Sequence, residues 1–176
     1  MLPLTRVGDR FNEPIKIVGG PKTVGRIQRS DGGEPGAEFA LPKTNLRVNR
    51  RSLIRAGQVV QAPGGDHFLV AEHSETGEYR THHLFPTDRR VEWTRQTVKI
   101  HPVSKQQVGS GKEELGTLWV MWERTRREFM DLSIRIAQEN YLIATGADVQ
   151  LGDYIDGKLV KRVNHALGVR ILELQG

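Results

Sequence analysis

Short stretches of alternating apolar and polar residues, separated by turns rich in Gly, Asp and Pro, fill two long parts of the chain. From Gly57 the sequence reads QVVQA, PGGD, HFLVAEH, SETG and EYRTHHLF, and near its end NYLIAT, GAD, VQLGDYI, DGK, LVKRV, NHALG and VRILEL. A period of two is the pattern of β-strands, and the residues between them favour tight turns. Asp156-Gly157 supplies the positive φ that a two-residue hairpin turn requires. The chain is therefore expected to be mostly β, as a small β-barrel or a sandwich of hairpins with long flexible loops.

The stretch from Thr117 to Asn140 fits both helical and strand periodicity. LWVMW is rich in β-forming residues and FMDLSIRIA alternates throughout, so two strands that turn near Arg124–Arg127 are favoured. An amphipathic helix over Arg124–Gln138 is the alternative.

Two long loops are expected, at about residues 28–49 and 102–114, because RSDGGEPGAEFALPKTN and PVSKQQVGSGKEELG combine Gly, Pro and polar residues. A chain of 176 residues has room for one sizeable core or two small β-modules. We expect a single β-rich domain over residues 1–176. Similar segments begin at Gly8, Gly57 and Gly152, but without a fixed period they indicate hairpin starts, with a duplication of small barrels as the alternative.

Composition excludes several classes of protein. The chain has no cysteine, so disulfides, thiolate metal sites and thiol nucleophiles are excluded. The longest apolar runs, LWVMW and YLIA, are far shorter than the ~20 residues that a membrane-spanning helix needs. The N-terminus shows no apolar signal segment. We therefore expect no membrane association, and a protein that is cytoplasmic or assembled in the cytoplasm.

No catalytic motif is present, and we expect the protein not to be an enzyme. G-x-S-x-G is absent, and QQVGSGKE is not a phosphate-binding loop because Gln106 stands where its first Gly belongs and Glu113 follows Lys112. The carboxylates of Asp153 and Asp156 are assigned to turns, since Asp side chains bond to nearby backbone N–H groups.

Four of the six histidines fall in one predicted hairpin. Pairing around SETG would put His67, His73 and His82 on one face, but their spacing matches no zinc motif. We expect no metal and no cofactor. An enzyme that uses this histidine hairpin is the least favoured alternative.

Positive charge is concentrated in the first part of the chain. The formal net charge is +5, and residues 1–66 hold 11 Lys and Arg against 6 Asp and Glu. Lys43, Arg47, Arg50, Arg51 and Arg55 follow one another with no intervening carboxylate. These five are candidate contacts to DNA or other phosphates, because Lys and Arg neutralise phosphate groups. A solvated loop that keeps the protein soluble is the simpler reading.

A second basic group, Lys158, Lys161 and Arg162, surrounds the last hairpin. Strand alternation would put Lys161 on the opposite face from Val160 and Arg162, so these side chains are not expected to form one stripe. No RNA-recognition aromatic motif appears. A reader of nucleotide sequence is therefore not expected, whereas diffuse contact with phosphates stays open.

In combination, GDRF near the N-terminus, SLIRAGQVV with GGDHFLVAEH, and the closing GDYIDGKLVKRVNHALGVRILEL resemble the head-closure or head-to-tail adaptor proteins of tailed bacteriophages. The resemblance implies a structural virion protein, assembled in the host cytoplasm, whose small β-barrel forms a ring that joins the portal to the tail and helps to retain DNA. Its partners would be further copies of itself, portal or adaptor and tail proteins, and viral DNA in the channel, reached by residues 28–49 or 102–114. The stretch Thr117–Gln138 is additional to the simplest members of this class.

Ring assembly requires two different contact patches on each subunit. Candidate interface residues are Phe39, in the first predicted loop, and Val169, Ile171 and Leu172, in VRILEL, which is expected to be an exposed strand edge able to pair with a neighbour. The rival reading is a cytoplasmic SH3-like β-barrel that binds nucleic acid, indicated by GDYIDGKLVKRV.

Overall fold

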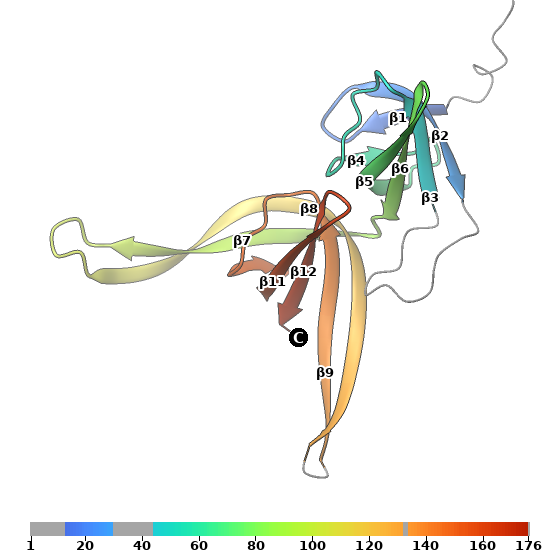
Figure 1. Ribbon diagram of the computed structural model, residues 1–176. Helices are drawn as coiled ribbons and strands as arrows, with labels where there is room; N and C mark the ends of the chain where they lie inside the picture. The colour runs from blue at the N-terminus through green and yellow to red at the C-terminus, as the bar shows by residue number, and fades with distance from the viewer. Residues whose placement is uncertain (1–12, 30–43, 132–133, 176) are drawn as a thin grey trace, which may run out of the picture. The chain divides into compact units, whose positions relative to one another are not determined.

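The computed structural model describes residues 13–29, 44–131 and 134–175 (Figure 1). The described residues form β-strands, turns and irregular segments, and none of them lies in a helix long and apolar enough to cross a membrane. The prediction of a mostly β fold with a β-barrel is confirmed. The described residues cluster into two compact units, those up to Thr87 with Leu167–Val169 and Asp88–Ala166 with those from Arg170 onward, where a single β-rich domain was expected. The strand pattern runs through this boundary without a linker-like segment, which is why the sequence did not mark it.

The first unit is a closed barrel of six strands with the order β1-β2-β3-β6-β5-β4. Its strands are β1 (Glu13–Ile17), β2 (Lys22–Arg29), β3 (Thr44–Asn49), β4 (Val59–Gln61), β5 (His67–Thr76) and β6 (Tyr79–Pro86). Pairing of β1 with β4, through Lys16 opposite Gln61, closes the barrel. Alternate residues point inward and form the core: Ile15, Ile17, Leu46, Val48, Ile54, Val60, Val70 and Leu84.

The second unit is also a closed six-stranded barrel, with the order β10-β11-β12-β9-β8-β7. Its strands are β7 (Arg89–Ile100), β8 (Gln107–Asp131), β9 (Ile134–Thr145), β10 (Asp153–Ile155), β11 (Lys158–Ala166) and β12 (Val169–Gln175). Pairing of β10 with β7 closes it. A separate apolar core fills it: Val91, Val120, Ile143, Val149, Ile155, Val160, Leu172 and Leu174. Two modest cores therefore replace the single core that was expected.

Residues 117–131 and 134–140 form strands, as favoured, and the helical alternative is wrong. The predicted turn near Arg124–Arg127 is misplaced, because β8 continues to Asp131 and β9 begins at Ile134. Each residue of that segment has a partner on β9, from Arg124 opposite Tyr141 to Arg127 opposite Gln138. A run of charged residues is typical of a turn, but a strand whose backbone is paired with a neighbouring strand accommodates such a run equally well.

The predicted loop at 102–114 is largely strand, so this prediction is wrong. β8 begins at Gln107 and pairs with β7, with Val98 opposite Ser110 and Ile100 opposite Gln107. Only residues 101–106 turn, closed by the His101 N–H donating to the Gln106 carbonyl at 2.9 Å. Gly and Ser carry no side-chain signal for a strand, yet their backbone groups pair normally with β7. We call the paired segment from Gln96 to Lys112 the β7–β8 arm, which extends beyond the other strands of its barrel (Figure 1).

The other predicted loop falls mostly outside the described residues, since β2 extends to Arg29 and β3 begins at Thr44. Phe39 and Lys43 lie outside the described residues with it. Its flanking ends, 28–29 and 44–49, are strand rather than loop.

The expectation that VRILEL is an exposed strand edge is wrong. β12 lies between β11 and β9 in a closed barrel, so both of its edges are paired. Leu172 is fully buried in the core, Val169 is buried and Ile171 is half-buried. Val169 and Leu172 are therefore unsuitable as contacts to another subunit. Closure of the barrel pairs both edges of the strand, and the local sequence pattern does not reveal this pairing.

Candidate phosphate-binding surface

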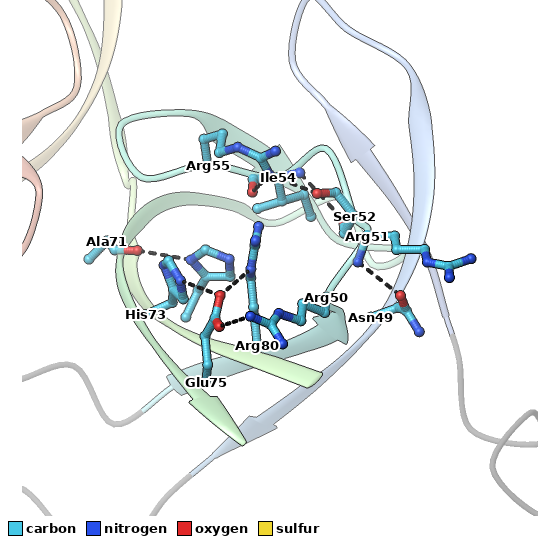
Figure 2. Close-up of polar contacts among 11 residues, drawn as sticks. Asn49, Arg50, Arg51, Ser52, Ile54, Arg55, Ala71, His73, Glu75 and Arg80 are labelled. Atoms are coloured by element: carbon cyan, nitrogen blue, oxygen red, sulfur yellow. Dashed lines mark hydrogen bonds and ion pairs between the residues drawn. The ribbon is translucent and has the colours of Figure 1, made fainter. Parts of the chain in front are cut away.

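Three of the predicted phosphate contacts, Arg50, Arg51 and Arg55, lie in the connection between β3 and β4 (Figure 2). Backbone hydrogen bonds fix this connection. The Arg50 N–H donates to the Glu78 carbonyl at 2.8 Å, and the Arg51 N–H donates to the Asn49 side chain at 2.9 Å. The arginines are thus presented from a defined turn rather than from a loose loop.

Arg50 and Arg51 border an open hollow at this end of the first barrel. It measures about 400 Å³ and is lined by Asn49, Arg50, Arg51, Gly77 and Glu78. The Arg51 guanidinium has no ion pair within the described part of the chain. An anion can therefore approach Arg51 without displacing a protein carboxylate.

Arg55 points back to its own connection. Its Nη1 donates to the Ser52 carbonyl at 2.7 Å and to the Ile54 carbonyl at 2.8 Å (Figure 2). Ile54 is fully buried, so these bonds fasten the turn to the barrel core. Arg55 is better explained as a support for the turn than as a phosphate contact.

Glu75 on β5 gathers three basic side chains in Figure 2. Its Oε2 lies 3.1 Å from Arg50 Nη2, and its Oε1 accepts hydrogen bonds from Arg80 Nε at 2.9 Å and from His73 Nε2 at 3.3 Å. The bond from Arg80, which outweighs the upward effect of burial, holds the pKa of Glu75 below its ordinary value. Arg50 is thereby partly neutralised. Sequence reasoning missed Glu75 and Arg80, whose meeting depends on strand register.

The histidine face is only partly as predicted. His73 lies directly opposite His82, with ring centroids 5.0 Å apart. The extra residue at the bulge between Val70 and His73 places His67 on the other face of β5. The structure has no group of three or more His, Cys, Asp or Glu residues suited to a metal ion, within the residues described.

His82 is buried, and its Nδ1–H donates to the Ala71 carbonyl at 3.1 Å. Burial lowers the pKa of His82, against a smaller upward effect of that hydrogen bond. A buried imidazole of this kind supports the barrel wall.

Arg47 lies on the outer surface of the first barrel, between the inward-pointing Leu46 and Val48. Its guanidinium carbon is 4.1 Å from the centroid of the Tyr79 ring, which holds the side chain by a cation–π contact. No carboxylate in the described part of the chain pairs with Arg47. Arg47 is therefore positioned and available for an anion.

The assignment of Asp153 to a turn is confirmed, because its carboxylate accepts a hydrogen bond from the Gln150 N–H at 2.9 Å. It is also buried and accepts hydrogen bonds from Trp93 Nε1 at 2.9 Å and from two nitrogens of Arg95. Burial alone would raise the pKa of Asp153, but these donors outweigh it and leave the pKa below the ordinary value. Asp156 pairs with Arg89 and has a φ of 52° in the predicted Asp156-Gly157 turn. Both carboxylates serve the architecture.

The arrangement expected for Lys161 and Arg162 is wrong. Val160 and Val163 both pack against the second core, so the two residues between them are both exposed. They border an open hollow of about 620 Å³ together with His165 and Arg170. Carboxylates compensate part of this charge, because Arg170 pairs with Asp148 and Arg162 lies 3.4 Å from Glu173. The first barrel is therefore the stronger candidate for binding phosphate.

Three comparisons, with protein-family models, with curated proteins and with solved structures, find no match to this chain.

Proposed function

We propose that this chain is a non-enzymatic structural virion protein of the head–tail connector, which assembles as a ring that joins the portal to the tail and helps to retain DNA. Each of the two closed barrels supplies a compact scaffold. The β7–β8 arm supplies an extended element able to reach a neighbouring subunit.

The observation that carries the proposal is the exposed apolar character of this arm. Val98 is 53 % exposed, Ile100 is 59 % exposed, and Val103 in the connecting turn is 84 % exposed. A two-stranded ribbon is marginally stable in water on its own and usually packs against further strands or another surface. Burial of these side chains against the next subunit would remove about 25 cal/mol per Å² of apolar surface from water.

This contact is of the kind that a ring needs. An arm on one subunit that docks on a different surface of the next subunit is a heterologous contact, which closes into a ring when the rotation permits. Arg47, Arg50 and Arg51 would supply the basic charge for DNA in the channel, through phosphates rather than bases.

Light scattering of the full chain, with and without portal protein, tests the proposal. We expect a discrete ring mass that is lost when residues 98–110 are replaced by an Asn-Gly turn joining Thr97 to Gly111, which face each other across the arm. A Ser104→Ala variant, altered in the same turn but with the apolar residues intact, should still assemble. The proposal is contradicted if the wild-type chain stays monomeric and binds neither portal nor tail proteins.

A second function, that of a cytoplasmic β-barrel module binding nucleic acid, is favoured by Arg47 and Arg51, which have no ion pair within the described residues. It differs in one measurable respect, because such a module binds nucleic acid as a monomer and assembles with no virion protein.

A further inference from the structure

One side of the first barrel combines basic residues from neighbouring strands. Ile15 and Ile17 point inward on β1, so Lys16 between them points outward. Gly25 points inward on β2, which places Lys22 and Arg26 on the outer side. With Arg47 on β3, these residues form what we call the basic face. Lys16, Lys22 and Arg26 were not among the residues predicted from sequence.

Strand register puts like charges beside each other on this face. Lys16 lies directly opposite Lys22, and Arg26 lies opposite Arg47. The two pairs are four residues apart along β2, or about 13 Å. Like charges directly opposite on neighbouring strands destabilise a sheet. A bound anion would relieve the repulsion between Lys16 and Lys22.

The basic face contains no carboxylate. The outward positions of β1, β2, β3 and β6 that the structure describes as exposed or half-buried are Pro14, Lys16, Lys22, Val24, Arg26, Gln28, Asn45, Arg47, Asn49, Tyr79, Thr81 and His83. Within the described residues, Lys16 and Lys22 have no ion pair. Glu13 is three residues from Lys16 on β1 and therefore points to the opposite side of the strand. Glu75 already forms ion pairs with Arg50 and Arg80. A merely solvated surface would normally mix both signs of charge.

We propose that the basic face binds the phosphate backbone of duplex nucleic acid without reading its sequence. Lys and Arg separated by about 13 Å along β2 can each contact a different, non-adjacent phosphate of a duplex backbone. Binding of single strands depends on open aromatic rings that stack with bases. Tyr79 is the one Phe, Tyr or Trp among these described outward positions, and Arg47 already lies over its ring. The duplex backbone is therefore the better fit, and this binding does not require ring assembly.

Fluorescence anisotropy of the full chain with a labelled 20-bp duplex, titrated at several salt concentrations, tests the proposal. Each lost phosphate contact lowers the slope of log K against log salt by about 0.9. The double variant Lys16→Gln/Lys22→Gln should therefore lower the slope by about 1.8 and weaken binding several-fold at low salt. Arg90→Gln/Lys112→Gln makes the same change of charge at exposed positions of the second barrel and should bind as the wild type does.

Equal binding of two duplexes of unrelated sequence supports contact through the backbone alone. Three results overturn the proposal: identical slopes for the two double variants, no binding of the duplex at low salt, or competition by poly-glutamate as effective as by duplex. Thermal unfolding of each variant confirms that it is folded. Because ring assembly is measured separately by mass, failure of this proposal is distinguishable from failure of the structural role.

Discussion

Arg95 and Asp153 are joined by two hydrogen bonds, from Arg95 Nε to Oδ1 at 2.6 Å and from Nη2 to Oδ2 at 2.9 Å. The pair links β7 to β10, the two strands that close the second barrel. Trp93 and the Gln150 N–H complete the donors around the buried carboxylate. Barrel closure in this unit thus depends on one fully satisfied buried charge.

Replacing Asp153 by Ala should lower the free energy of unfolding by about 3 kcal/mol, because the partly buried donors of Trp93, Arg95 and Gln150 lose their acceptor. Urea unfolding monitored by tryptophan fluorescence measures the change. Asp148→Ala provides the control, since Asp148 is 70 % exposed in its pair with Arg170, and exposed pairs contribute about 0–1 kcal/mol. Equal effects of the two substitutions would contradict the structural role of Asp153.

His82 predicts a dependence of stability on pH. Its pKa is lowered in the folded state from the ordinary 6.5, so the unfolded chain binds more protons between the folded pKa and 6.5. The stabilising contribution is therefore complete above pH 6.5 and is lost as the pH falls below it towards the folded pKa. Thermal melts from pH 8 to pH 5 should show this loss in the wild type and a smaller loss in His82→Gln. His165→Gln, altered at an exposed position, should retain the wild-type profile, and a similar slope in His82→Gln would refute the assignment.

Gly25 is required by close packing inside the first barrel. A Cβ there would lie 2.8 Å from Leu46 Cδ1 and 2.9 Å from Val48 Cγ1. Gly25→Ala should therefore destabilise the protein by about 1–3 kcal/mol through overpacking. Gly109→Ala is the matched change in another strand, where a Cβ meets nothing within 4 Å, and it should be close to neutral in the same denaturation assay. A neutral Gly25→Ala would mean that the barrel wall relaxes freely.

The turn between β10 and β11 gives a prediction about backbone conformation. Gly157 has a φ of 80°, and the preceding Asp156 also has a positive φ. Gly157→Ala should cost about 1 kcal/mol, because a Cβ disfavours the left-handed region. Gly157→Asn should cost less, since Asn tolerates that region better. Denaturation midpoints of the two variants measure the difference, and the reverse order would argue against strain at this turn.

Local patterns predicted the hairpins well, as the Asp156-Gly157 turn and the strands beginning at His67 and Tyr79 illustrate. Pairing between strand segments was harder to predict from the sequence. The β7–β8 arm depends on Gly109 and Gly111, which look like loop residues until β7 pairs with them. The burial of Leu172 follows from barrel closure, which alternation cannot reveal.

The candidate site shows the same division. Arg47, Arg50 and Arg51 lie close together in the sequence, so the run of basic residues was enough to predict them as phosphate contacts. Lys16 and Lys22 gain significance only because strand register places them opposite each other. Lys161 and Arg162 are both exposed between Val160 and Val163, which both pack against the second core, so strict alternation does not hold there either.

Electron micrographs of the full chain incubated with portal rings test the central claim, assembly into a connector ring, most directly. The account predicts an additional coaxial ring at one end of the portal, absent when the β7–β8 arm is shortened. Undecorated portals beside separate monomer-sized particles of the wild-type chain would contradict it.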